Sequence, residues 1–358
     1  MGRVLAARER TGSWRVAMVV PLQGPAGLFG PSCEAISELA VHEVNAAGGI
    51  LGREVQLEIV DGGAPPGKVA DELRRLLDLG RVDAVTGWHI SSVRNALAPV
   101  LAGRVPYVYT SLYEGGERRS GIYCCGEVPR FQIRPALRWL RDQLGVRRWF
   151  IVGNDYVWPR GTSVAVHRYA HELGLDIVGE TFVQLGSPTA NQLAMHAALS
   201  GCDGVFMLLV GQDAVYFNQR FAEYGLHEGI VRFSPLMEEN MLLASGDSAT
   251  RNLFASAAYF RSLVTADAAD LRSRYMQLHG PTAPPLSNMA ESCYEGMHTL
   301  ATLVSRAGTT ELAGLNAAID GVAYHGPRGT IEFQGQQAAQ HVYLAAANGY
   351  DFDVITRL

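Results

Sequence analysis

Residues 55–87 read VQLEIVDGGAPPGKVADELRRLLDLGRVDAVTG, with two short apolar runs on either side of an amphipathic segment. Residues 55–61 and 82–87 are typical of buried strands, and residues 69–80 carry apolar side chains at helical spacing. The link after the first strand is rich in Gly and Pro, which interrupt regular structure. A strand, a helix and a strand in this order predict a βαβ unit in a parallel sheet that is covered on both faces.

The same alternation extends along the rest of the chain. In the first block, strands are expected at 14–20 and 105–110 and helices at 32–49 and 91–102. The second block is expected to contain helices at 135–145, 163–174, 191–201 and 214–225 and strands at 148–155, 176–184, 204–210 and 230–235. Helices at 291–308 and 311–321 return to the first block, and 329–335 with 341–352 predict a hairpin pair that closes the second. The fold class predicted is α/β, with two similar blocks in tandem.

Length and composition limit the function classes. A chain of 358 residues favours two domains, and its net charge of −5 without a Lys/Arg block argues against direct binding of nucleic acid. No stretch approaches the roughly 20 apolar residues of a membrane span. Residues 1–13, expected to be flexible, lack the apolar core of a secretory signal, so a cytoplasmic protein is expected unless a signal was removed. The five scattered cysteines fit buried thiols in a reducing compartment.

Sequence motifs of catalysis are missing. The chain has no GxSxG, GxGxxG after the first strand, Walker loop or HExxH. His167 and His171 share a helix face without a third ligand, and the adjacent Glu238 and Glu239 would point apart. We therefore expect no catalytic residue, no metal and no cofactor.

Polar and aromatic residues instead follow several strands at the point where each strand ends. Ligands of such folds bind beyond the carboxyl ends of the strands. The candidate ligand-binding residues are His89, Ser91, Ser92, Tyr109, Ser111, Tyr113, Tyr156, Trp158, Leu236 and Glu238. Free N–H groups at a helix start would suit a carbonyl or carboxylate oxygen. Each residue also has a structural alternative: the serines as helix caps, and the aromatic residues as edge or interlobe packing.

Several stretches carry a family resemblance: HEVNAAGGILGREVQLEIVD (42–61), SSVRNALAPV (91–100), YEGGE (113–117), GNDYVWPRG (153–161) and HGPRGTIEF (325–333). On these the chain resembles the type I periplasmic-binding-protein superfamily over roughly residues 16–344. Within it, the chain is most similar to the urea and short-chain amide branch, and there to the cytoplasmic amide-sensing regulators of aliphatic amidase operons.

The resemblance implies two Rossmann-like parallel-sheet lobes joined by three crossovers and closing on a ligand. The crossings would fall near Gly126, near 256–259 and near 324–326. The N-terminal lobe would then comprise 14–126 and 257–324, and the C-terminal lobe 127–256 and 325–358. The family's binding positions would fall on His89, Ser91, Tyr109, Ser111, Tyr156 and Trp158, with a hydroxyl position near Leu236. Because His89, Trp158 and Leu236 depart from the pattern, we expect an amide with a larger apolar group.

Two functions follow from these expectations. The first is an intracellular sensor that binds a small neutral amide or urea-like ligand and regulates genes of amide or nitrile metabolism through a separate regulatory protein. The alternative is the substrate-binding component of an ABC importer of urea, amides or branched-chain amino acids, in which Glu238 would compensate an amino group. Neither is an enzyme, and homo-oligomerisation stays open.

Overall fold

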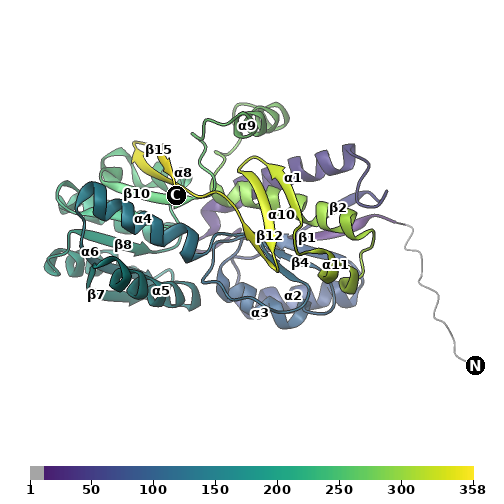
Figure 1. The fold of residues 1–358 in the computed structure, drawn as a ribbon, viewed down its shortest axis with the longest axis horizontal. Coiled ribbons are helices and arrows are strands. Elements are labelled where there is room, and N and C mark those ends of the chain that lie inside the picture. The colour runs from purple at the N-terminus through teal and green to yellow at the C-terminus, as the bar shows by residue number, and fades with distance from the viewer. Residues whose placement is uncertain (1–11) are drawn as a thin grey trace, which may run out of the picture.

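The computed structural model describes residues 12–358 as two α/β lobes that lie side by side (Figure 1). Each lobe has a mostly parallel sheet with helices on both faces, so the predicted fold class is confirmed. The flexible segment expected at 1–13 lies almost entirely outside the described residues.

The first sheet has eight strands in the order β11-β12-β13-β5-β4-β3-β1-β2. Its strands are β1 (Trp14–Val20), β2 (Val55–Asp61), β3 (Ala84–Gly87), β4 (Tyr107–Tyr109), β5 (Ile122–Cys124), β11 (Ala323–Gly326), β12 (Gly329–Gln334) and β13 (Gln337–Ala339). The helices of this lobe are η1 (Gly27–Phe29), α1 (Gly30–Ala46), α2 (Pro66–Asp78), α3 (Ser91–Leu101), α9 (Ala266–His279), α10 (Asn288–Ala307) and α11 (Leu312–Ala318). Helices α2 and α3 pack together on one face, and α1 packs on α10 on the other (Figure 1).

The second sheet has seven strands in the order β15-β14-β10-β9-β8-β6-β7. They are β6 (Arg148–Asn154), β7 (Asp176–Val183), β8 (Gly204–Leu208), β9 (Val231–Ser234), β10 (Leu253–Ala257), β14 (Tyr343–Asn348) and β15 (Asp351–Arg357). Its helices are α4 (Pro129–Leu144), α5 (Val157–Leu173), α6 (Ala190–Leu199), α7 (Gln212–Glu223), η2 (Leu226–Glu228), α8 (Glu239–Ser245) and η3 (Asp247–Thr250). Helix α4 packs on α5, and α7 packs on α6 and α8.

The opening stretch folds as its pattern predicts. Strands β2 and β3 both pair in parallel with β1, which lies between them. Helix α2 buries Val69, Leu73 and Leu76 and leaves its charged residues on the solvent side. The apolar periodicity of α2 therefore sets which face of this helix packs on the sheet.

The third crossing lies later in the chain than expected. Residues 329–334 do not form a hairpin pair on the second lobe, because β12 pairs antiparallel with both β11 and β13 in the first sheet. Gln337 of β13 then pairs in parallel with Cys124 of β5. The chain makes its third crossing between β13 and β14. The boundary expected at 324/325 is therefore wrong for β12 and β13, and the proposed lobe boundary moves to about residue 340.

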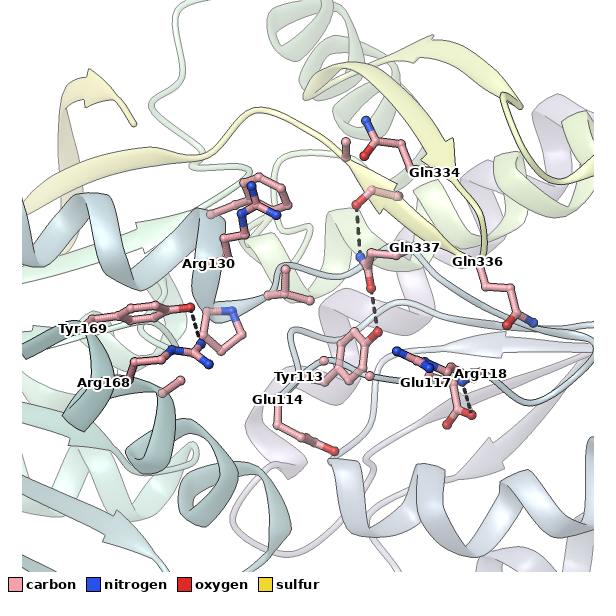
Figure 2. Close-up of a pocket in the computed structure, with 18 residues that line it drawn as sticks. Tyr113, Glu114, Glu117, Arg118, Arg130, Arg168, Tyr169, Gln334, Gln336 and Gln337 are labelled. Atoms are coloured by element: carbon pink, nitrogen blue, oxygen red, sulfur yellow. Dashed lines mark hydrogen bonds between the residues drawn. The ribbon is translucent and has the colours of Figure 1, made fainter. Parts of the chain in front are cut away.

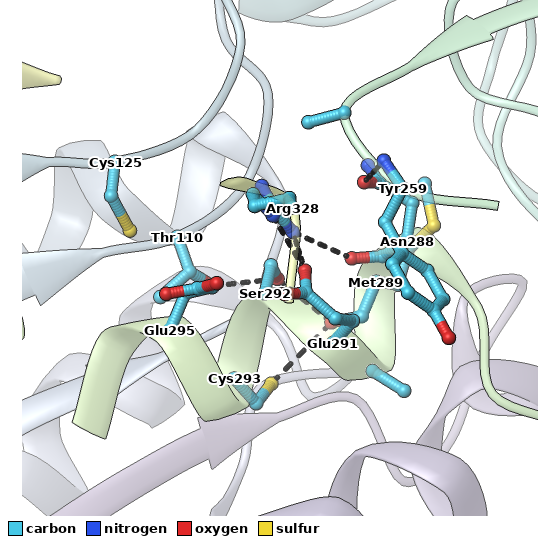
Figure 3. A network of polar contacts seen from close by, with 12 residues as sticks. Thr110, Cys125, Tyr259, Asn288, Met289, Glu291, Ser292, Cys293, Glu295 and Arg328 are labelled. Carbon is cyan, nitrogen blue, oxygen red and sulfur yellow. Dashed lines mark hydrogen bonds and ion pairs between the residues drawn. The ribbon is translucent and has the colours of Figure 1, made fainter. Parts of the chain in front are cut away.

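Buried polar residues link the three crossings, which lie at 125–128, 258–265 and 340–342 (Figure 3). The carboxylate of Glu127 accepts hydrogen bonds from the backbone N–H of Ala258 (2.8 Å) and from Asn288 (2.9 Å). Arg328 forms a fully buried ion pair with Glu291 of α10 and donates to Gln340 at 3.0 Å. Burial raises the pKa of Glu295 well above its usual value, and the charge of Glu291 adds to this shift. We call this group of residues at the three crossings the hinge. It contains the carboxyl groups of Glu127, Glu291 and Glu295 and the cation Arg328, and thus more carboxyl groups than cations.

Candidate functional site

The carboxyl ends of the parallel strands of the two lobes face each other, and the loops there meet. The N–H of Gln212 in the second lobe donates to the carbonyl oxygen of Pro25 in the first at 2.9 Å. Glu114 of the first lobe lies against Gly161 of α5, where a Cβ would come 3.0 Å from the Glu114 Cβ. These contacts enclose the loops that carry the predicted site residues.

Ser91 is the first residue of α3, and its hydroxyl donates to the Glu114 carboxylate at 2.8 Å. Glu114 also forms an ion pair with Arg94, whose guanidinium lies over the rings of Tyr109 and Tyr113. Ser92 follows Ser91 in the helix and is half-buried. No side chain among the described residues caps this helix end, so the expected role of the serines as side-chain caps is wrong. The start of α3 is left with free N–H groups that favour an oxygen acceptor.

His89 is held inside the first lobe. Its Nδ1 lies 3.1 Å from the Val19 carbonyl oxygen, and its Nε2 lies 2.6 Å from the Tyr107 hydroxyl. Burial lowers the pKa of His89 to about 4, which keeps the ring neutral. Because both ring nitrogens have partners within the first lobe, the His89 ring has no free polar atom to offer a ligand.

The hydroxyls of Ser111 and Tyr109 hold the backbone of His89. Ser111 donates to the His89 carbonyl oxygen at 2.7 Å and accepts from its N–H at 2.9 Å, and the Tyr109 hydroxyl donates to the same carbonyl at 2.9 Å. Tyr113 donates to Gln337 at 2.6 Å and is buried. These three residues fix the loops around the cleft, and their hydroxyls are already engaged within the protein.

Tyr156 and Trp158 come from the second lobe, where α5 begins at Val157, six residues before the helix expected at 163. Pro159 fits in the first turn because the N–H that it lacks would have no acceptor inside the helix. Tyr156 is half-buried, and burial together with the charges of Tyr109 and Glu114 raises its pKa well above the usual value. Trp158 is buried beside it, with the ring centroids 6.3 Å apart. Tyr156 therefore faces the Ser91–Glu114 side of the cleft.

Leu236 and Glu238 follow β9, and both are buried. Within residues 12–358, neither carboxylate oxygen of Glu238 forms a hydrogen bond of regular geometry, although Ser287, Asn240 and the N–H of Met241 lie near enough to lower its pKa. Burial raises the pKa of Glu238 to about 8, and the neighbouring Glu239 adds to the shift. Burial raises the pKa of Cys33 in α1 well above its usual value, and the charge of Glu238 adds to this shift, so Glu238 lies within electrostatic range of the first lobe. A buried carboxyl group without a paired cation carries a large desolvation cost.

Sequence reasoning missed the apolar wall of the site. Trp88 directly follows β3 and packs edge to face on Phe29 of η1, with the ring centroids 4.9 Å apart. Both residues belong to one buried cluster with Trp158, Leu236 and Met237, which spans the two lobes. Trp88 could have been predicted from its position, because it directly follows a strand end and precedes His89, which the sequence analysis did select.

The described part of the chain holds no group of three or more His, Cys, Asp or Glu side chains placed to bind a metal ion. None of the helices in that part has the length and apolar character needed to cross a bilayer. All five cysteines are buried and unpaired.

Residues 13–351 match the family described as periplasmic binding protein. The chain belongs to the periplasmic binding protein family. A curated member, Leu/Ile/Val-binding protein homolog 8 of Brucella abortus, is 29% identical over 225 residues, and the match spans 57% of this chain and 54% of that protein. The chain thus matches about half the length of such curated relatives.

Solved members of the family share the fold over nearly the whole chain. A leucine-binding protein of Thermotoga maritima superposes with a TM-score of 0.84 at 18% identity, over 96% of this chain and 98% of that one. A branched-chain amino acid binding protein of Streptococcus pneumoniae, solved with isoleucine, gives 0.82 at 16% identity over 96% and 99%. A solute-binding protein of an ABC transporter from Rhodopseudomonas palustris, solved with 3,4-dihydroxybenzoic acid, gives 0.83 at 19% identity over 97% of each chain.

These findings correct the expected location. The family is one of periplasmic binding proteins, and the solved relatives include solute-binding proteins of ABC transporters, which act outside the cytoplasm. The expectation of a cytoplasmic protein is therefore wrong. The superfamily that the sequence resembles is confirmed, and the comparisons show relatives that bind amino acids and aromatic acids, where the resemblance pointed to an amide-sensing regulator.

Proposed function

We propose that this protein is the solute-binding component of an ABC importer and that its solute carries a nitrogen group that donates hydrogen bonds beside a compact apolar group. Its partner is then the importer's membrane permease, which replaces the separate regulatory protein expected from the sequence. The family and the two-lobe fold support the importer function. The composition of the cleft supports the class of solute.

The observation that carries the proposal is the Glu238 carboxyl group, which is 1% exposed, has no cation paired with it and forms no hydrogen bond of regular geometry in the described part of the chain, although Ser287, Asn240 and the N–H of Met241 lie near it. A carboxylate in such a place is stabilised by a cationic or hydrogen-bond-donating ligand group. An ammonium group fits best, because it returns both a charge and several donors.

The other end of the solute is expected at the start of α3, where N–H groups at Ser91 and Ser92 are free to donate. Trp88, Phe29 and Leu236, which belong to one buried apolar cluster, would cover an apolar side chain. An α-amino acid with an apolar side chain combines these three requirements. Relatives that bind leucine and isoleucine support this choice.

A short neutral amide is the second candidate, and the Ser91–Glu114 contact favours it. The hydroxyl of Ser91 donates to a carboxylate, so a ligand carboxylate would approach a negative group. Arg94 offsets that charge only through its ion pair with Glu114. An amide oxygen at the helix start would avoid the repulsion, and the amide N–H groups could reach Glu238 or Tyr156.

The test begins with protein that has been unfolded and refolded to remove any bound solute. Leucine, isoleucine, phenylalanine, acetamide, isobutyramide, urea and benzoate are then compared by thermal shift and calorimetry. We expect an apolar amino acid, or failing that an amide, to raise Tm by binding the folded state. Stabilisation by benzoate alone would contradict the proposal.

Glu238→Gln separates the role of the carboxylate from general packing. For an amino acid we expect at least a tenfold loss of affinity, because a charge-assisted hydrogen bond of about 1.5–3 kcal/mol is lost. Glu223→Gln is the matched control, since Glu223 lies exposed in the same lobe and pairs with Arg220. Equal affinities of the wild type and Glu238→Gln would show that Glu238 does not bind the solute.

A further inference from the structure

A cavity of about 500 Å³ lies at the boundary of the lobes (Figure 2), and its lining includes Tyr113 and Glu114 but not Ser91, Tyr156 or Glu238. The first lobe contributes the loop 113–118 and the turn between β12 and β13. The second lobe contributes the start of α4 and the side chains of Arg168 and Tyr169 from α5. The cavity thus lies beside the crossings, and residues of both lobes form its walls.

Three arginines line this cavity: Arg118 from the first lobe, and Arg130 and Arg168 from the second. Within residues 12–358, none of the three has a carboxylate within ion-pair distance. Arg168 donates to the hydroxyl of Tyr169 at 3.2 Å and lies over the ring of that tyrosine, 5.0 Å from its centroid. Arg130 lies near the ring of Phe131, 5.3 Å from its centroid. Their guanidinium groups are exposed and remain available to an anion.

The acidic residues of the cavity do not cancel this charge. Glu114 forms an ion pair with Arg94, and Glu117 pairs with Arg119 at 2.9 Å and lies 3.9 Å from Arg94. Each carboxylate is therefore balanced by an arginine outside the cavity lining, and the three lining arginines are in excess.

Helix α4 adds a further positive end. It begins at Pro129, in the cavity wall, and no side chain among residues 12–358 caps it. The positive end of a helix of this length favours an anion. Gln334 and Gln336 also line the cavity (Figure 2). The Gln334 amide can donate to an oxygen, whereas the Gln336 amide already donates to the Arg119 carbonyl oxygen at 2.8 Å.

We propose that this cavity is a binding site for a small oxyanion with two or more negative charges, such as a phosphate ester or a di- or tricarboxylate. The anion would bridge Arg118 of the first lobe and Arg130 and Arg168 of the second. Because its contacts come from both lobes, it stabilises the lobe arrangement in which they converge. If the solute in the cleft needs the same arrangement, anion and solute strengthen each other's binding.

The direct test measures anion binding without any solute, so that its outcome is independent of the proposed transport function. Pyrophosphate and citrate are titrated by calorimetry into the full chain, with sodium chloride at matched ionic strength as the reference. We expect one site per chain for at least one of the two anions. Binding of neither would overturn the proposal.

Arg130→Gln and Arg168→Gln test the geometry, because each removes one guanidinium and retains a polar side chain. We expect each to weaken anion binding at least tenfold. Arg147→Gln is the control, since Arg147 is exposed at the start of β6 and does not line the cavity. Equal weakening in all three variants would show a diffuse effect of net charge and would overturn the site.

A last arm distinguishes a free anion from a lipid headgroup of the same chemistry. Vesicles of phosphatidylglycerol are mixed with the protein and sedimented, with phosphatidylcholine vesicles as the reference. Because the arginines lie in a cavity, we expect the soluble anions to bind and the vesicles to retain no more protein than the reference. Retention that Arg168→Gln abolishes, without binding of the soluble anions, would overturn the proposal in favour of a lipid surface.

Discussion

The backbone N–H of Gln212 in the second lobe bonds to the carbonyl oxygen of Pro25 in the first at 2.9 Å. The preceding residue, Gly211, has φ of +49°, and a Cβ at this position would overlap that carbonyl oxygen. The contact across the cleft thus depends on a residue without a side chain.

Gly211→Ala should therefore prevent this approach of the lobes. We expect solute affinity to fall at least tenfold while both lobes stay folded, and the radius of gyration measured by X-ray scattering with solute to stay at its solute-free value. Gly246→Ala is the matched control: its φ of +89° and ψ of 150° also lie in a region that only glycine adopts readily, at a cost of about 1–3 kcal/mol, but a Cβ there meets no atom within 4 Å. If both variants bind solute equally well, the contact is not needed for closure.

The carboxyl groups after β9 predict a dependence of stability on pH. Burial raises the pKa of Glu238 to about 8 and that of Glu239 to about 7. Above pH 4.5 the unfolded chain loses these protons while the folded chain retains them, so the free energy of unfolding falls as pH rises towards 8. We expect Tm of the solute-free protein to fall between pH 5 and 8, and Glu238→Gln to reduce that slope. An unchanged slope would contradict the raised pKa of Glu238.

Tyr156 and Trp158 should respond differently to truncation. Tyr156 is half-buried at the cleft, so Tyr156→Ala should weaken solute binding with only a small change in Tm. Trp158 is 3% exposed within the core, and Trp158→Ala should cost about 3–5 kcal/mol of stability. Urea denaturation and calorimetry of the two variants measure both effects. The reverse pattern would place the tryptophan, and not the tyrosine, at the solute.

The Arg328–Glu291 pair of the hinge should be costly to break from one side (Figure 3). Arg328→Met leaves a buried carboxylate without its partner, and we expect a loss of about 3–5 kcal/mol in urea denaturation. Adding Glu291→Gln should recover part of this loss. Arg220→Met, which breaks the exposed pair with Glu223, should change stability by less than about 1 kcal/mol. Equal losses in the two single variants would mean that burial does not strengthen the pair.

The order of strands and helices could be predicted because apolar periodicity is local. Strands β1 to β3 and helix α2 follow directly from it. The return of β12 and β13 to the first sheet could not be predicted, because these short strands alternate polar and apolar residues and could pair at the edge of either sheet. Only the long-range pairing of Gln337 with Cys124 settles the choice.

The candidate site shows the same limit. The sequence located the strand ends, and it identified Ser91, Tyr156 and Glu238 there. It did not show that His89 is bonded to Tyr107 and Val19, because those partners come from other strands. Nor did it show that the Glu238 carboxyl group is buried without a paired cation, since this is visible only when all its neighbours are placed.

The last strand of each sheet has a consequence for truncation of the chain. The first sheet gains its final strand only at residues 337–339, and the second at residues 351–357. Neither lobe has its full set of strands without these late segments, even though the first strand of the first lobe begins at residue 14. Both lobes therefore need residues 337–357 to complete their sheets, and a chain truncated near residue 320 would leave both sheets with an unpaired edge.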